Sequence, residues 1–181
     1  MLEYFSGRGD CLDLFEEIYR QNFDKVFRFL QKLTGNYTLS EDLAQETFLR
    51  AFESFERFDG SCEIYTWLIS IAKHVYYKYL KKNKMMLQSS NLDVIIDTYQ
   101  TLNTDENPPE AFDRKLMRDA IIKVIGKLPE KYRDVVILRI YGEMNFSQVG
   151  FALGISENSA KVIYCRAKKM LKEEFENEIG L

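Results

Sequence analysis

The stretch that decides the fold spans residues 145–171 and reads NFSQVGFALGISENSAKVIYCRAKKML. A short helical period over 146–152 ends at the turn Gly154-Ile155-Ser156, and a longer helical period follows over 157–176. Asn145 and Ser156 directly precede the two periods, and both are residue types that cap helix N-termini. Two helices joined by a tight turn that contains glycine form a helix-turn-helix, whose second helix reads the major groove of DNA.

The second of these helices is predicted to have two different sides. Four apolar side chains share one side and are expected to be buried: Ile163, Ala167, Met170 and Leu171. Five other side chains are expected to face outward: Asn158, Lys161, Cys165, Lys168 and Lys172. Outward Asn and Lys side chains can reach base edges and phosphates. A plain helical hairpin with a solvated basic face would show the same pattern, so the motif alone leaves that alternative open.

Helical periods also fill the amino-terminal part of the chain. The first has apolar residues at three- and four-residue steps, among them Tyr19, and ends near Gly35. The second starts at a capping box formed by Thr38 and Glu41, and its inner stripe is Leu43, Thr47, Phe48, Ala51, Phe52 and Phe55. The third helix is expected over 66–82.

Two more helical periods, over 111–126 and 130–141, precede the helix-turn-helix. The sequence therefore predicts an all-α protein of two small helical domains, residues 1–84 and 110–181, joined by a flexible linker over 85–109.

The linker assignment comes from charge and composition. Residues 1–84 hold 12 basic and 13 acidic side chains and residues 110–181 hold 13 and 11, whereas residues 85–109 hold four acidic side chains and no basic one. That segment also contains Pro108-Pro109 and shows no sustained helical period. At 25 residues it is longer than an ordinary loop. We therefore expect an acidic tether between two domains.

The third helix ends in a basic segment with aromatic neighbours. Residues 73–84 contain five lysines and no acid: Lys73, Lys78, Lys81, Lys82 and Lys84. Several tyrosines and Trp67 lie close in sequence. Lysines attract phosphates, and aromatic rings stack on the bases of single-stranded nucleic acid. An ordinary solvated face is the alternative interpretation.

Composition and cysteine usage exclude several other classes of protein. The 181-residue chain is 46% hydrophobic and 29% charged, which excludes disorder as its main state. It has neither an apolar run of membrane-spanning length nor a signal-peptide pattern, so we expect a cytoplasmic protein. Three separated cysteines and one histidine give no metal-ligand spacing, disulfide framework or nucleophile–base pair. No metal, cofactor or catalytic residue is expected.

Three stretches of this sequence together resemble a known family. They are LAQETFLRA at 43–51, RFDG at 57–60 followed by TWLISIA at 66–72, and LPEKYR at 128–133 followed by LGIS at 153–156. In this order and spacing they look like the extracytoplasmic-function (ECF) group of bacterial sigma factors, within the sigma-70 superfamily. The resemblance covers nearly the whole chain, and it is specific because the stretches occur together with a linker of suitable length.

The resemblance implies that residues 1–84 are sigma region 2 and residues 110–181 are sigma region 4. Sigma factors are not enzymes and have no small-molecule substrate. They bind core RNA polymerase, and the holoenzyme recognises and opens promoter DNA. The linker resembles the segment that is threaded toward the polymerase active centre. The family also implies an anti-sigma factor, often membrane-bound, as a further partner.

The resemblance also assigns residues to sites. Binding of core polymerase is assigned to Asp42, Leu43, Gln45, Glu46 and Phe48. Recognition of the -10 element and promoter melting are assigned to Asp59, Gly60, Ser61, Cys62, Tyr65, Trp67, Lys73, His74, Tyr77, Lys78 and Lys81. Recognition of the -35 element is assigned to Arg139, Asn158, Ser159, Lys161, Val162, Cys165, Arg166 and Lys168, with Arg139 placed for a phosphate contact.

The chain departs from the family pattern at several of these positions. Asn158-Ser159-Ala160 stands where the family commonly has Gly-Thr-Val, and Gly150 stands where Ala is frequent. Cys62 and Ile64 replace the commoner Ser and Phe, and His74 stands where Asn is frequent. These departures concern the promoter sequence that is recognised rather than the role of the protein.

A stand-alone helix-turn-helix regulator, whose N-terminal helices sense a ligand or dimerise, is the leading alternative. The acidic N-terminal domain and the lack of long coiled-coil heptads count against its dimeric form. A structural helical adaptor is a third interpretation, but it leaves the lysines and tyrosines of residues 73–84 unexplained.

Overall fold

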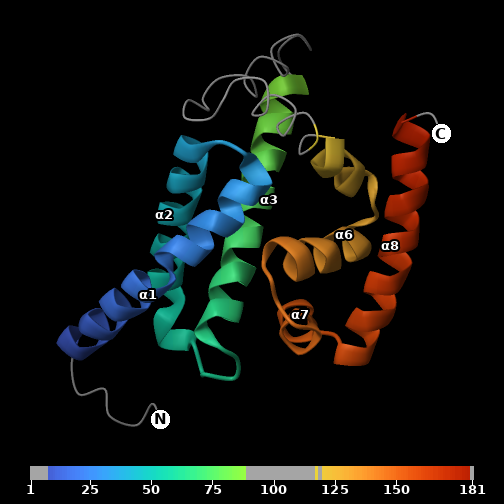
Figure 1. Ribbon diagram of the computed structural model, residues 1–181. Coiled ribbons are helices and arrows are strands. Elements are labelled where there is room, and N and C mark those ends of the chain that lie inside the picture. The colour runs from blue at the N-terminus through green and yellow to red at the C-terminus, as the bar shows by residue number, and fades with distance from the viewer. Residues whose placement is uncertain (1–7, 89–116, 118–119, 180–181) are drawn as a thin grey trace. The chain divides into compact units, whose positions relative to one another are not determined.

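The computed structural model describes residues 8–88, 117 and 120–179 (Figure 1). The elements in these ranges are, in chain order, α1 (Arg8–Thr34), α2 (Tyr37–Ser54), the 3-10 turn η1 (Phe55–Arg57), α3 (Ile64–Gln88), α6 (Glu130–Val136), the π-helical turn η3 (Ile137–Tyr141), α7 (Phe146–Leu153) and α8 (Glu157–Ile179). Residues 120–127 form a further helical segment. The predicted all-α fold class is confirmed.

The chain divides into two compact units, residues 1–102 and 103–181. The helices α1 to α3 belong to the first unit, and α6 to α8 belong to the second. From residue 89 onward the predicted linker lies outside the described residues, and residues 85–88 continue α3. The exact domain and linker boundaries therefore stay a prediction.

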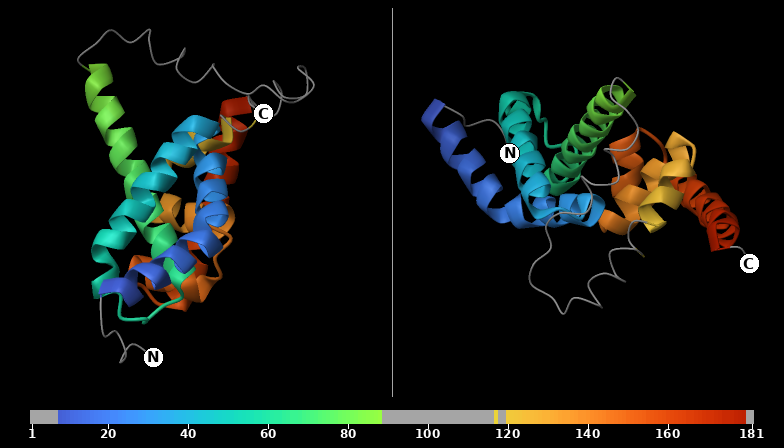
Figure 2. Two further views of the ribbon diagram at one scale, coloured as in Figure 1. Left: turned by 90° about the vertical axis from the view of Figure 1, so that its left-hand side faces the viewer. Right: turned by 90° about the horizontal axis from the view of Figure 1, so that it is seen from above.

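In the first unit α1 crosses both α2 and α3, as the views in Figures 1 and 2 show. The interior between them contains Phe29 and Leu30 of α1, Phe48 of α2, and Leu68 and Ile69 of α3, each at most 3% exposed. Burial of one such side chain stabilises a fold by about 1.5–3 kcal/mol. This interior fixes the three helices of the unit against one another and leaves one side of each helix in solvent.

The junction of α1 and α2 differs in one detail from the prediction. Gly35 ends α1 in the left-handed conformation, with φ 64°, as its position predicts. The N-cap of α2 is Asn36, whose side-chain oxygen accepts a hydrogen bond from the amide of Leu39 at 2.9 Å. The predicted capping box of Thr38 and Glu41 is wrong, because α2 has already begun before Thr38.

Two aromatic residues that were expected inside lie at the edge of the first unit. Phe52 is 44% exposed and Tyr19 is 38% exposed. Each keeps a ring contact with the interior, since the centroid of Phe52 lies 5.1 Å from that of Phe15 and Tyr19 lies 4.8 Å from Phe48. The 3.6-residue period places both side chains on the flank of their apolar stripes, so part of each ring stays in solvent.

In the second unit α8 packs against both α6 and α7. Val135, Leu138 and Ala167 are fully buried there. The helix expected over 130–141 is continuous, but its second half is the π-helical turn η3. In this turn the amide of Gly142 donates to the carbonyl of Ile137 at 3.1 Å. Apolar periodicity does not distinguish such a turn from a regular helix.

The helices α7 and α8 form the predicted helix-turn-helix. Asn145 and Gln148 cap α7 reciprocally, with hydrogen bonds of 2.9 and 2.8 Å between each side chain and the other's backbone amide. Gly154 ends α7 with φ 65°. Ser156 then caps α8, because its hydroxyl accepts a hydrogen bond from the amide of Ser159 at 3.1 Å. Both predicted N-caps are confirmed.

Gly150 allows α7 to approach the turn very closely. A Cβ atom at this position would lie 2.7 Å from the carbonyl oxygen of Ile155 and 3.2 Å from the amide nitrogen of Glu157. Both neighbours are backbone atoms, and they lead directly into α8. A side chain at position 150 would therefore push α8 away from α7.

We predict that Gly150→Ala lowers the free energy of unfolding by about 1–3 kcal/mol, the usual cost of overpacking. The matched control is Gly126→Ala, since a Cβ at this helical and exposed position would meet nothing within 4 Å. That control should be neutral or stabilise by up to about 1 kcal/mol, because Ala favours helix over Gly. Urea unfolding followed by circular dichroism measures both changes. Equal stabilities for the two variants would show that the turn yields without cost.

Candidate nucleic-acid and partner interfaces

The outward side of α8 carries every residue of that helix assigned to -35 recognition. All of them are exposed: Asn158, Ser159, Lys161, Val162, Cys165, Arg166 and Lys168. On the other side Ala160 and Ala167 are fully buried and Ile163 is 8% exposed, while Met170 and Leu171 are half-buried. The predicted two-sided helix is confirmed, and the DNA contacts themselves stay a prediction.

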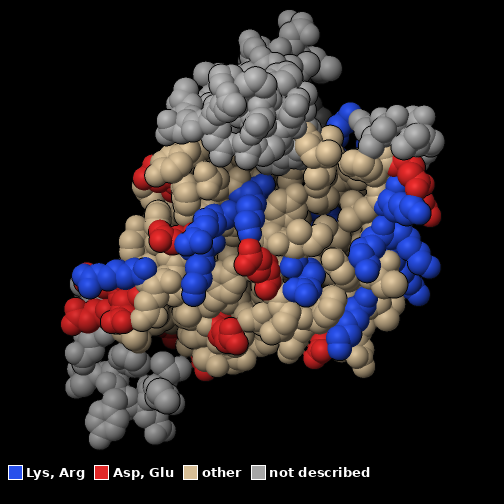
Figure 3. Space-filling model, in the orientation of Figure 1, with Lys and Arg blue, Asp and Glu red and all other residues tan. Residues whose placement is uncertain are grey.

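The outward side of α8 is also strongly basic. Residues 158–172 contain five basic and no acidic side chains: Lys161, Arg166, Lys168, Lys169 and Lys172. Figure 3 shows lysine and arginine gathered along this helix. Lys161 forms an ion pair of 2.6 Å with Glu157 in the first turn. In a chain of net charge -3, this run makes α8 a local surface that attracts anions.

Arg139 lies in the π-helical turn η3 and contacts the start of α7. Its Nη1 atom donates a hydrogen bond of 2.8 Å to the carbonyl of Met144, and its guanidinium carbon lies 5.1 Å from the centroid of the Phe146 ring. Arg139 therefore links η3 to the helix-turn-helix. The phosphate contact that was expected of Arg139 stays a prediction.

A hollow of about 510 Å³ opens beside this contact, between η3 and α8. Its lining is Arg139, Phe146, Lys161, Tyr164, Cys165 and Lys168. Phe146 and Tyr164 meet edge to face with centroids 5.5 Å apart, and the ammonium of Lys168 lies 5.4 Å from the Tyr164 centroid. Three cationic side chains around one hollow favour a phosphate group as its ligand.

The outer side of α2 carries only part of the set assigned to polymerase binding. Asp42 and Gln45 are exposed, and Glu46 is half-buried beside Arg50, with an ion pair of 2.6 Å. These three side chains give this side of α2 polar and acidic groups.

Leu43 and Phe48 do not belong to this outer side. They are 6% and 3% exposed and pack into the interior of the first unit, and their assignment to polymerase binding stays a prediction. Two apolar side chains that were not predicted on this outer side, Leu49 and Phe52, are 55% and 44% exposed. Their three- and four-residue steps from Gln45 could have placed them on the outer side of α2.

The segment 59–65 assigned to the -10 element begins as a loop of defined shape and enters α3 at Ile64. The carboxylate of Asp59 accepts a hydrogen bond from the amide of Ser61 at 2.9 Å, and Gly60 between them has φ 72°. Hydrogen bonds from the Ser61 side chain and then its backbone lower the pKa of Asp59, so this carboxylate is charged at neutral pH. Burial, followed by the negative charge of Asp59, raises the pKa of Cys62, so its thiol stays neutral.

Aromatic contacts support this loop from α3. The ring of Trp67 lies 4.9 Å from that of Phe58 and 6.2 Å from that of Phe55. Trp67 is half-buried, and its contacts join α3 to η1 and to the start of the loop. Tyr65 is also half-buried, and the ammonium of Lys25 lies 5.9 Å from its ring centroid.

The exposed side of α3 keeps most of the residues assigned to the -10 element. His74, Lys78 and Lys81 are exposed, and Tyr77 is half-buried. The Nδ1 atom of His74 lies 2.7 Å from the carbonyl oxygen of Ser70, which holds the imidazole along the helix. Basic and aromatic groups therefore share one exposed side of the helix.

Lys73 does not share that side. It is only 5% exposed, because it lies one helical turn from Ile69 and from Tyr76, which are 0% and 7% exposed. Its ammonium lies 5.9 Å from the centroid of the Tyr77 ring. Lys73 is therefore buried beside Tyr77, and its assignment to the -10 element stays a prediction.

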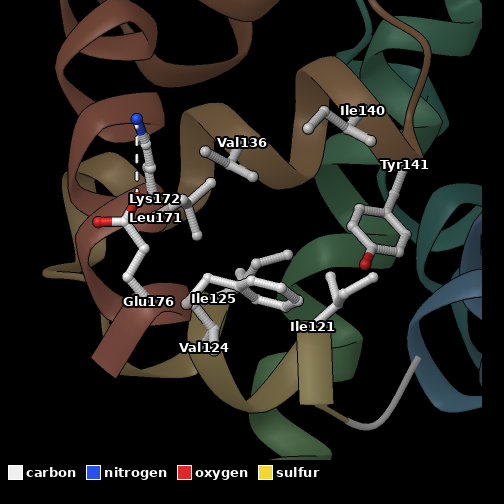
Figure 4. A pocket seen from close by; sticks show the side chains of 10 residues that line it. Ile121, Val124, Ile125, Val136, Ile140, Tyr141, Leu171, Lys172 and Glu176 are labelled. Atoms are coloured by element: carbon white, nitrogen blue, oxygen red, sulfur yellow. Dashed lines mark ion pairs between the residues drawn. The ribbon is translucent and has the colours of Figure 1, made fainter. Parts of the chain in front are cut away.

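An apolar groove of about 400 Å³ was not foreseen from the sequence. It lies in the second unit between residues 120–127, the continuous helix of α6 and η3, and the C-terminal half of α8 (Figure 4). Its lining is Ile121, Val124, Ile125, Val136, Ile140, Tyr141, Leu171, Lys172, Phe175 and Glu176. Ile121 and Ile140 are 37% and 48% exposed, and an ion pair of 3.6 Å joins Lys172 to Glu176. An exposed apolar groove is a feature of protein-binding surfaces.

Comparison with known proteins identifies the family. Residues 18–85 match sigma-70 region 2, and residues 118–171 match sigma-70 region 4. The ECF RNA polymerase sigma factor SigM of Bacillus subtilis is 30% identical to this chain over 157 residues, covering 87% of this chain and 92% of SigM. This chain belongs to the ECF sigma factors. Like other sigma factors, it directs the initiation of transcription.

Other relatives support the same family and fold. The ECF sigma factor SigW of Bacillus subtilis is 27% identical to this chain over 171 residues, and the alignment covers 92% of this chain and 91% of SigW. The sigma factor RpoE of Bartonella quintana, solved with the anti-sigma factor NepR, has the same fold, with a TM-score of 0.63 and 18% identity over 91% of this chain and 98% of that one. No helix in the described ranges is both long and apolar enough to cross a membrane.

We predict that Arg139 stabilises the helix-turn-helix. Arg139→Ala removes a charge-assisted hydrogen bond and the contact with Phe146, so the free energy of unfolding should fall by about 1–3 kcal/mol. Lys169→Ala, on the exposed side of α8, should change it by less than about 0.5 kcal/mol. Denaturant titration of both variants measures the difference. If the Arg139 variant were as stable as the Lys169 variant, the contacts of Arg139 with Met144 and Phe146 would not stabilise the protein.

Proposed function

We propose that this ECF sigma factor works through three surfaces. Region 2 (residues 1–84) binds core RNA polymerase through α2 and the -10 element through the 59–65 loop and α3. Region 4 (residues 110–181) binds the -35 element through α8, and residues 85–109 form the linker. The observation that carries the proposal is α8, where the residues assigned to DNA are all exposed and residues 158–172 hold five positive charges and no negative one. The protein acts by binding and not by catalysis.

The proposed polymerase-docking face consists of five exposed or half-buried side chains of α2: Asp42, Gln45, Glu46, Leu49 and Phe52. The first three supply polar and negative groups, and the last two supply exposed apolar area. A face of this kind suits a basic partner with apolar side chains of its own. Docking would also bring the two DNA-binding regions to a fixed separation, so that two weak contacts act as one bivalent contact.

The double charge reversal Asp42→Lys with Glu46→Lys should abolish transcription that depends on added core polymerase, because it reverses the charge of the docking face. The matched control is Asp13→Lys with Asp24→Lys, two exposed acids of α1 outside that face. Transcription from genomic promoter fragments and circular dichroism are measured for both. The control should keep both its activity and its helical signal.

The same reagents separate this proposal from a stand-alone regulator. The free protein has net charge -3 and should bind promoter fragments weakly in a gel shift, whereas the holoenzyme should bind them tightly. Tight, specific binding by the free protein would favour the stand-alone helix-turn-helix regulator instead.

The exposed side of α3 is proposed to hold the displaced strand of the opened promoter. His74, Lys78 and Lys81 offer charge and hydrogen-bond donors in solvent, and the Tyr77 ring lies among them. Stacking of a base on an aromatic ring contributes about 1–3 kcal/mol, which can offset the cost of unstacking the base from duplex DNA. Asp59, Gly60 and Ser61 of the adjoining loop are exposed and available to an extruded base.

Tyr77→Ala should therefore impair transcription from a duplex promoter more than from the same promoter with mismatches around the start site, because stacking is needed to trap melted bases. Tyr79→Ala, at another half-buried tyrosine of the same helix, serves as the control and should affect the two templates alike. Abortive-transcript yields on both templates measure the ratio. Equal defects of Tyr77→Ala on the two templates would move Tyr77 out of the melting step.

An anti-sigma factor is the proposed regulator. Two proteins with the fold of this chain were solved with a protein partner: RpoE with the anti-sigma factor NepR, and CnrH with the cytosolic domain of CnrY, at TM-scores of 0.63 and 0.57. The apolar groove of the second unit is a candidate seat for apolar side chains of that partner, since Ile121 and Ile140 at the groove are exposed.

A further inference from the structure

The outward side of α8 carries one exposed branched apolar side chain among polar and basic ones. Val162 is 50% exposed. Valine has a low helix propensity, and exposing its apolar side chain to water does not stabilise the fold. At 100° per residue, Asn158, Val162, Cys165 and Lys169 lie within about 60° of one another on this side. Val162 therefore lies near the middle of the surface that faces away from the interior of the second unit, beside Asn158, Cys165 and Lys169.

Basic side chains lie on both flanks of Val162. Lys161 and Lys168 lie on one flank, where they line the hollow beside Arg139, and Arg166 lies on the other. When a recognition helix enters the major groove, its flanks face the two phosphate backbones and its centre faces the base edges. A valine near the middle, between basic flanks, is the arrangement that would place Val162 on bases and the cations of the flanks on phosphates.

Among the four bases, only thymine presents a methyl group in the major groove. We propose that Val162 is a specificity-determining residue that recognises one thymine of the -35 element through that methyl group. This inference rests on the proposed function of α8. Val162 suits the role better than Cys165, because branching at Cβ leaves one preferred rotamer in a helix and so fixes the position of its two methyl groups.

The test replaces thymine by uracil, which keeps every base-pairing group and lacks only the methyl. The full chain with core RNA polymerase is first used to map its promoter from genomic fragments. Each thymine of the -35 element, on either strand, is then replaced singly by uracil in synthetic promoters. The wild-type holoenzyme should lose about three- to fivefold in initiation at one position, the loss that corresponds to one buried methyl group. Uracil in the spacer between the two elements is the control and should have no effect.

Two variants connect that position to Val162. Val162→Ala removes both γ-methyl groups, so it should initiate less from the thymine promoter and show no further loss with uracil. Val162→Thr keeps one γ-methyl group and should retain part of the thymine preference. Because Val162 is exposed, both variants should keep the helical signal of the wild type.

Two results would overturn the inference: a -35 element in which no uracil replacement lowers initiation, or a Val162→Ala variant that keeps the full thymine preference. Failure of the proposed function has a different signature, since no fragment would then yield transcripts that depend on both core polymerase and this protein.

Discussion

The contact between Gly150 of α7 and the backbone of the following turn governs the position of α8. Because position 150 has no side chain, the carbonyl of Ile155 and the amide of Glu157 can approach α7 more closely than a Cβ atom would allow. Gly154 then reverses the chain in the left-handed conformation, and Ser156 caps the new helix. On the packed side of α8, the small side chains of Ala160 and Ala167 are fully buried. This close packing determines which side of α8 faces solvent and is available to DNA.

The π-helical turn η3, which continues α6, is held against the start of α7 by its residue Arg139. It brings Arg139 to the carbonyl of Met144 and to the ring of Phe146, so one cationic side chain joins η3 to the start of α7. Arg139 also lines the basic hollow beside α8. Arg139 therefore has two roles in this unit: it holds the helix-turn-helix in place, and it contributes a positive charge to the basic surface.

In the first unit, aromatic packing takes the place of tight glycine contacts. Phe15 meets Phe48, Phe52 and Phe55 edge to face, and these contacts orient α2 on α1. The same packing turns Leu43 and Phe48 inward and leaves Leu49 and Phe52 outside. The overall charge of -3 is a poor guide to these surfaces, because local runs of one sign control what each helix attracts.

Periodicity and capping residues were enough to predict the helices, the turn at Gly154 and the exposed side of α8, because these depend on neighbours within one or two turns of the chain. The sequence motifs likewise predicted the family. The burial of Lys73, Leu43 and Phe48, the π turn at Arg139 and the apolar groove at Ile140 could not be predicted in this way. They depend on which helices pack together, and side chains near the boundary between two sides of a helix are buried or exposed according to that packing alone.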